Sequence, residues 1–112
     1  MAKFQAFDAD DLTDDATDEN ARPYRELMRR PGFSMGIYRL AAGGEDHQHP
    51  HHSDEVYVVQ SGRAVLRVEG EDRPVRPGSV ISVDRGAEHG FRDITEDLTL
   101  LVMFAPPEVP EA

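Results

Sequence analysis

From Phe33 onward, hydrophobic and polar residues alternate in short runs along the chain. These runs are rich in valine, isoleucine, tyrosine and phenylalanine, which are enriched in strands. They predict strands at residues 35–41, 55–60, 63–69, 74–76, 79–83, 89–94 and 98–104. Turn-forming residues separate the runs at 43–44, 61–62, 70–72, 77–78, 85–86 and 95–97. Regularly spaced strands without a long helical pattern between them indicate an all-β sandwich or barrel.

The two ends of the chain differ from this central pattern. Residues 8–19 carry seven acidic and no basic side chains, which is typical of a flexible, solvated segment because like charges oppose packing. Residues 24–30 contain good helix formers, so either a helix or a lead-in strand fits them. With 112 residues, we expect one domain: an N-terminal arm and lead-in segment (1–34), a barrel (35–105) and an extended tail (106–112).

Composition narrows the class of protein further. The chain has 12 Lys and Arg against 22 Asp and Glu, a net charge of -10, so a nucleic-acid partner is not expected. No apolar run approaches the roughly 18 residues of a membrane-spanning helix, and the N-terminus lacks the apolar part of a secretory signal. We therefore expect a cytoplasmic protein with no membrane partner. Because cysteine is absent, any chemistry has to use histidine, carboxylate or hydroxyl groups.

A histidine cluster is the most informative feature of the sequence. Four of the five histidines are His47, His49, His51 and His52. On an extended chain His49, His51 and Glu55 point to the same side, although Pro50 limits this argument. His89 supplies a third imidazole, and three nitrogens with one oxygen suit divalent Fe, Mn, Ni, Cu or Zn. The alternative is a solvated histidine-rich loop; clustering beside an acid in a β context favours the metal site.

The same residues resemble the first motif of the cupins, a family of small β-barrels. That motif, G-x5-H-x-H-x3-E-x6-G, is met in type and spacing by Gly43, His49, His51, Glu55 and Gly62. The resemblance implies a small jelly-roll barrel. We expect its glycines to have structural roles, at turns or at positive φ.

The second cupin motif, G-x5-P-x-G-x2-H-x3-N, is met in part. Gly78, Gly86 and His89 match it, whereas Asp84 replaces the proline and Asp93 replaces the asparagine. An aspartate can stabilise a turn through its own side chain, so the first replacement threatens the fold little. The second places an anionic group where a neutral amide is usual.

Carried over to this chain, the resemblance implies one metal ion held inside the barrel by His49, His51, Glu55 and His89. His47 and His52 have no place in the motif and are interpreted as mouth or surface residues, although His47 or Gln48 could replace a ligand if the loop bends. Tyr38, Tyr57, Phe91 and Met103 lie on predicted strands and could line a pocket, but such residues in a barrel more often form core, and they are interpreted in that way.

Two functions fit such a site, because cupins share a fold and differ in activity. The first is a metal-dependent enzyme, a dioxygenase or a Lewis-acid isomerase or cyclase, that acts on a small organic molecule. The second is a non-catalytic protein that binds a metal or a small ligand. No catalytic residue beyond the metal ligands is assigned.

A homodimer is also expected, because some predicted strands are apolar on both faces. Residues 98–104 contain only Thr99 as a polar residue, and residues 56–59 repeat the pattern. A barrel wall that faces water alternates apolar and polar residues. The outer face therefore needs a cover, either residues 4–28 or a second chain, and the resemblance to cupins favours the second chain.

Overall fold

The computed structural model describes residues 3–8, 24–46 and 52–108. The strands are β1 (Tyr24–Arg29), β2 (Ser34–Leu40), β3 (Asp54–Val68), β4 (Glu71–Val75), β5 (Val80–Val83) and β6 (His89–Ala105). All pairings are antiparallel, in the order β1-β2-β6-β3-β4, and β5 also pairs with β3. The described part of the chain contains no helix, which confirms the all-β prediction.

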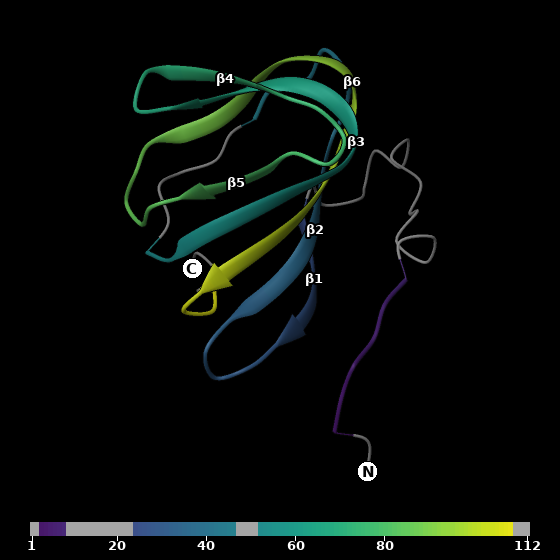
Figure 1. Cartoon of the computed structure of the whole chain (residues 1–112), viewed down its shortest axis with the longest axis vertical. Coiled ribbons are helices and arrows are strands. Elements are labelled where there is room, and N and C mark those ends of the chain that lie inside the picture. The colour runs from purple at the N-terminus through teal and green to yellow at the C-terminus, as the bar shows by residue number, and fades with distance from the viewer. Residues whose placement is uncertain (1–2, 9–23, 47–51, 109–112) are drawn as a thin grey trace.

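Two long strands, β3 and β6, curl the sheet into a small jelly-roll barrel (Figure 1). They pair with each other along most of their length. Because both strands bend sharply, their first and last halves lie on different walls. The two halves of β3 and of β6 therefore enclose one interior, and the predicted site residues of these strands can meet there.

β3 bends at Gly62, and its continuous course through this bend differs from the predicted strand boundaries. Breaks were expected at 61–62 and 95–97, but each pair of predicted strands is one continuous strand with irregular register at the bend. Gly62 has φ +94°, and a Cβ there would meet the backbone of Asp97 and the Leu98 Cα, the latter at 2.7 Å. Only glycine lets the two strands approach this closely.

The bend also changes which residues of β3 face inward. Before it, Glu55, Tyr57 and Val59 are buried, and after it Ala64 and Leu66 are buried. This change from odd to even positions follows from the bulge, because one extra residue reverses the alternation. The barrel interior is filled by residues of five strands, among them Leu40, Val75, Val83, Leu100 and Phe104.

Residues 24–29, for which helix and strand were both open, form the edge strand β1. Pairing with β2 and an edge-on contact of the Tyr24 ring with Phe104, at 5.7 Å between centroids, favour the strand. Past β6, the Glu108 amide donates to Ser34 Oγ at 2.8 Å. Of the acidic stretch 8–19, all but Asp8 lies outside the described residues. Within the described ranges, no helix has the length and hydrophobicity needed to cross a bilayer.

Candidate metal centre

Two of the four predicted ligands, Glu55 and His89, meet inside the barrel. Glu55 lies near the start of β3 and His89 begins β6, so 34 positions of sequence separate them. Their side chains are each 1% exposed, and His89 Nε2 lies 2.7 Å from Glu55 Oε2. Curling of the sheet therefore brings a buried imidazole and a buried carboxylate into direct contact.

The second ring nitrogen of His89 determines which donor atoms face each other. Nδ1 lies 2.8 Å from the carbonyl oxygen of Ala87, and since a carbonyl only accepts, Nδ1 carries the proton. The neutral ring then keeps its lone pair on Nε2, which faces the carboxylate of Glu55. Two electron-pair donors at this distance need a cation between them, either a proton or a metal ion.

The pKa of His89 reflects the same arrangement. Burial by itself lowers this pKa, because it disfavours the charged ring. The hydrogen bonds to Glu55 and to the Ala87 carbonyl, with the negative charges of Glu55 and Asp46, outweigh burial and raise the pKa above its ordinary value. The site thus attracts a positive charge to Nε2.

Tyr57 belongs to this site, although the sequence interpretation assigned it to the core. Its hydroxyl lies 3.0 Å from His89 Nε2 and 3.4 Å from Glu55 Oε2, and its residue is 0% exposed. Phe91 packs edge-on against the Tyr57 ring at 5.1 Å. One signal in the sequence points to Tyr57: it follows Glu55 by two positions, so both share one face of a strand.

Asp46, which the sequence interpretation also missed, anchors the chain just before the histidine cluster. It accepts hydrogen bonds from the Tyr38 hydroxyl at 2.5 Å and from the Phe91 amide at 2.8 Å. On the other side of the cluster, buried Ser53 donates to the Pro106 carbonyl at 2.6 Å. Asp46 and Ser53, the described residues nearest the histidine cluster, are therefore each fixed by hydrogen bonds to distant parts of the barrel.

The remaining predicted site residues have different outcomes. His49 and His51, with His47 and Gln48, lie outside the described residues, so their part in the site stays a prediction. His52 is exposed, as expected of a mouth or surface residue. Within residues 3–8, 24–46 and 52–108, no three or more His, Cys, Asp or Glu side chains form a group able to hold a metal ion.

Asp93, which replaces the motif asparagine, is exposed and has φ +48°. Asparagine and aspartate tolerate this left-handed conformation better than other residues with side chains. Asp93 therefore allows the backbone of β6 to adopt a left-handed conformation at this position. Gly43 and Gly78, at φ +75° and +92°, likewise have the structural roles expected of motif glycines.

Glu55 and His89 contribute two donor atoms whose chemistry suits a metal ion. Imidazole nitrogen and carboxylate oxygen suit divalent Zn, Fe, Mn, Ni or Cu. Nε2 of His89 and Oε2 of Glu55 face each other at 2.7 Å, the length of a charge-assisted hydrogen bond. The Ala87 carbonyl orients the ring through Nδ1, as such partners do in histidine metal sites. Metal binding itself stays a prediction.

Comparison with known proteins identifies the family. The cupin domain matches residues 36–104. An uncharacterized protein of Streptomyces coelicolor is 45% identical over 104 residues, which cover 93% of this chain and 98% of that protein. The L-ectoine synthase of Vibrio campbellii is 30% identical over 93 residues, covering 80% of this chain and 73% of the synthase. A crystal structure of a Thermus thermophilus protein has a TM-score of 0.72 at 27% identity, covering 93% of this chain and 99% of that one. By its sequence and its barrel, the chain belongs to the cupin domain family.

Proposed function

We propose that this cupin is a metal-dependent enzyme, of the dioxygenase or the Lewis-acid isomerase or cyclase type, that acts on a small organic molecule. One divalent transition metal would be held by His49, His51, Glu55 and His89. The observation that carries the proposal is the buried contact between Glu55 and His89, with the Nε2 lone pair facing the carboxylate. When bound, such an ion supplies Lewis-acid chemistry, polarising and orienting an oxygen atom of a substrate.

The neighbouring residues support an enzymatic site by keeping the ligands in place. The Tyr57 hydroxyl contacts both Glu55 and His89, and its ring is held by Phe91. These buried rings exclude water around the pair, and a dry site strengthens electrostatic interactions. An L-ectoine synthase among the relatives supports a catalytic function over passive binding, because that relative is an enzyme.

Metal content tests the ligand assignment. We expect wild-type protein to bind about one divalent ion per chain, as the ligand count implies, measured by elemental mass spectrometry after dialysis. His89→Ala and Glu55→Gln should lose most of it, since each removes a donor or its charge. His52→Ala is the matched control, because its exposed ring lies beside the cluster. Equal loss in all three variants would contradict the assignment.

Turnover separates the enzyme from the non-catalytic alternative. Metal-loaded protein is incubated with small acids, thiols, phenols and keto compounds while oxygen consumption and products are measured. Oxygen consumption supports the dioxygenase type, and conversion without oxygen consumption supports the isomerase or cyclase type. Tight binding of a compound without any conversion favours a non-catalytic binding protein and overturns the enzymatic proposal.

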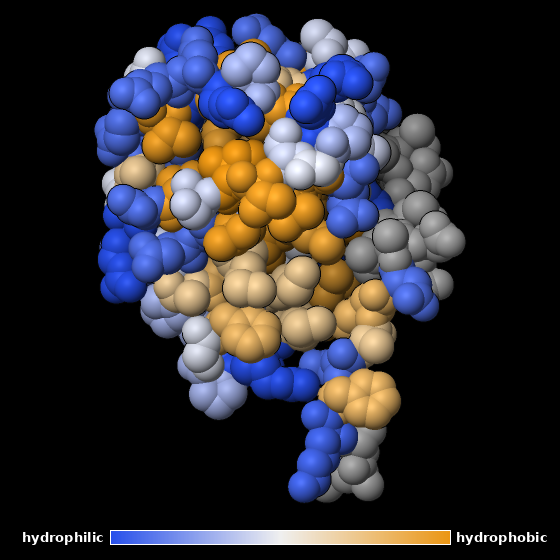
Figure 2. Space-filling model, viewed as in Figure 1, coloured by the Kyte–Doolittle hydropathy of each residue, from blue (hydrophilic) through white to orange (hydrophobic). Residues whose placement is uncertain are grey.

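We also propose that two copies of the chain associate through the outer face of β2, β6, β3 and β5. Across these strands Met103 pairs with Met35 and Val56, and Val58 pairs with Leu101 and Val80. Figure 2 shows apolar residues gathered at the centre of this face with a polar rim, as in protein interfaces. Val80 is 66% exposed, and Met103, which the sequence analysis interpreted as core, is 38% exposed and belongs to this outer face.

Residues 3–8, which include the start of the alternative cover 4–28, do not lie on this face, whereas residues 9–23 of that segment lie outside the described part of the chain. Residues 3–8 extend away from the barrel in Figure 1, and Phe4 is 73% exposed. Light scattering on wild-type protein should give twice the 12.5 kDa of one chain. Met103→Glu should give a monomer, whereas Thr95→Glu, which adds the same charge outside the patch, should not. A monomeric wild type at tens of micromolar would refute the dimer.

A further inference from the structure

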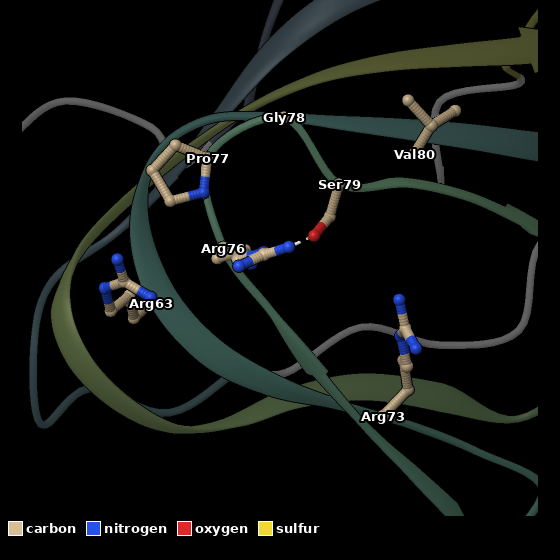
Figure 3. Close-up of a pocket in the computed structure, with 7 residues that line it drawn as sticks. All are labelled: Arg63, Arg73, Arg76, Pro77, Gly78, Ser79 and Val80. Atoms are coloured by element: carbon tan, nitrogen blue, oxygen red, sulfur yellow. Dashed lines mark hydrogen bonds between the residues drawn. The ribbon is translucent and has the colours of Figure 1, made fainter.

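A hollow lined by three arginines lies at the turn between β4 and β5 (Figure 3). Its volume is about 560 Å³, within the range of small-molecule sites. The lining residues are Arg63, Arg73, Arg76, Pro77, Gly78, Ser79 and Val80. None of these described residues is acidic, and none belongs to the predicted set of metal ligands.

The arginines are unusual in a chain with a net charge of -10. Arg63 comes from β3, Arg73 from β4 and Arg76 from the turn, so three segments bring positive charge to one hollow (Figure 3). Arg63 has a long contact with Glu96 at 3.7 Å. In the part of the chain that the structure describes, Arg73 and Arg76 form no ion pair. Among the described residues, no carboxylate competes with an external anion for these two guanidinium groups.

A rigid turn holds one side of the hollow. Residues 76–79 form a four-residue turn in which the Ser79 amide donates to the Arg76 carbonyl at 2.9 Å. Pro77 occupies the second position of the turn, and Gly78, with φ +92°, occupies the third. This is the sequence and conformation of a type II turn, in which proline presets φ and glycine accepts a positive φ. The turn is fixed to β3, because the Gly78 amide donates to the Val59 carbonyl at 2.9 Å.

The hydroxyl of Ser79 is oriented by the same turn. Its oxygen accepts a hydrogen bond from the Arg76 amide at 3.0 Å, so its own proton can be donated elsewhere. Figure 3 shows this hydroxyl beside Arg76, with Arg73 set apart from it on another strand that lines the hollow. The site thus combines guanidinium groups with a hydroxyl donor on a preorganised turn.

We propose that this hollow binds a small organic anion that carries carboxylate or phosphate groups. The planar fork of arginine matches both groups and donates two parallel hydrogen bonds to either. Because the guanidiniums come from different segments, a ligand with two acidic groups meets more than one of them. A long polyanion is disfavoured, since the net charge of the chain repels it at distance. The site is independent of the proposed metal centre.

The test uses the full chain after removal of metal by a chelator, so that no probe can bind through a metal ion. Calorimetry measures binding of inorganic phosphate, succinate and 3-phosphoglycerate at low and physiological salt. Variants are Arg73→Gln and Arg76→Gln. Arg30→Gln is the matched control, because it removes the same charge from an exposed position in the β1–β2 turn. Thermal melts confirm that each variant is folded.

We expect at least one probe to bind, and each pocket variant to weaken it about tenfold, the size of a lost charge-assisted hydrogen bond. Affinity should fall with salt, and Arg30→Gln should change it less than about twofold, as expected of a distant, screened charge. Preference for phosphate or for succinate identifies the acidic group. Absence of binding by all three probes, or equal weakening by Arg30→Gln, would overturn the proposal. Loss of binding in Glu55→Gln would also overturn it, by placing the anion at the metal centre.

Discussion

Replacing Gly62 by alanine is expected to lower the free energy of unfolding by roughly 2–5 kcal/mol. Gly62 has φ +94°, and placing an L side chain in a left-handed conformation costs roughly 1–2 kcal/mol. The new Cβ would also lie 2.7 Å from Leu98 Cα and closer still to the Asp97 carbonyl. Both contacts are with backbone, which cannot move aside by a rotamer change, and such overpacking costs typically about 1–3 kcal/mol.

Gly70→Ala is the matched control for this prediction. Gly70 has φ +82°, but no atom lies within 4 Å of a Cβ built there. Gly70→Ala should therefore lower the free energy of unfolding only by the cost of the left-handed backbone conformation, roughly 1–2 kcal/mol. The difference between the two variants isolates the cost of the close approach of β3 and β6.

The assay is equilibrium unfolding in urea followed by circular dichroism. Free energies of unfolding can be compared only if the slope with denaturant stays the same. If Gly62→Ala is no more destabilised than Gly70→Ala, the close contact at the bend does not exist as described. If Gly62→Ala does not fold at all while Gly70→Ala does, the close contact at the bend contributes more to the free energy of unfolding than the roughly 2–5 kcal/mol expected, with the same sign.

Two further predictions concern Asp46 and Asp72. Asp46→Ala removes the acceptor for the Tyr38 hydroxyl and the Phe91 amide, so the chain before the histidine cluster loses its attachment to the barrel. Metal affinity, measured by chelator competition, should then fall about 10–100-fold. Unchanged affinity would show that Asp46 does not position the ligands. Hydrogen bonds from Arg67 hold the pKa of Asp72 below its ordinary value. The pair therefore stabilises the fold at pH values above the unfolded pKa of about 3.9. This stabilisation is lost as the pH falls through the lower pKa of the folded state. Asp72→Asn should therefore melt below wild type at pH 7 and together with it in strong acid, and a difference that persists in acid would contradict the electrostatic origin.

Several features of the fold could be predicted from the sequence because they depend on local chemistry. Short runs rich in valine, isoleucine, tyrosine and phenylalanine between turn residues indicate strands, and the all-β class and most strand positions that they predicted were confirmed. The motif glycines Gly43, Gly62 and Gly78 were expected at turns or positive φ, and all three have positive φ. Glu55 and His89 were selected by residue type and spacing, and they lie in contact.

Other features depend on which distant segments pack together. The runs on either side of Gly62 look like two strands, and only the approach of β6 shows that the chain bends without a break. The helix formers of residues 24–29 adopt a strand because β2 offers backbone partners. Tyr57 looks like plain core until its hydroxyl is found beside His89.

The sequence by itself determined the type of fold and the candidate ligand pair of this cupin, and the tertiary structure decided how residues far apart in the chain meet. Asp46 reaches the amide of Phe91 across 45 positions, and Arg63 and Arg76 meet at one hollow because β3 curls beside the β4–β5 turn. The physical reason is that residue type and alternation set the local backbone conformation and the inward face of each strand. Contacts between distant residues depend on the register and curvature of paired strands, which arise only when the whole sheet closes and its interior packs.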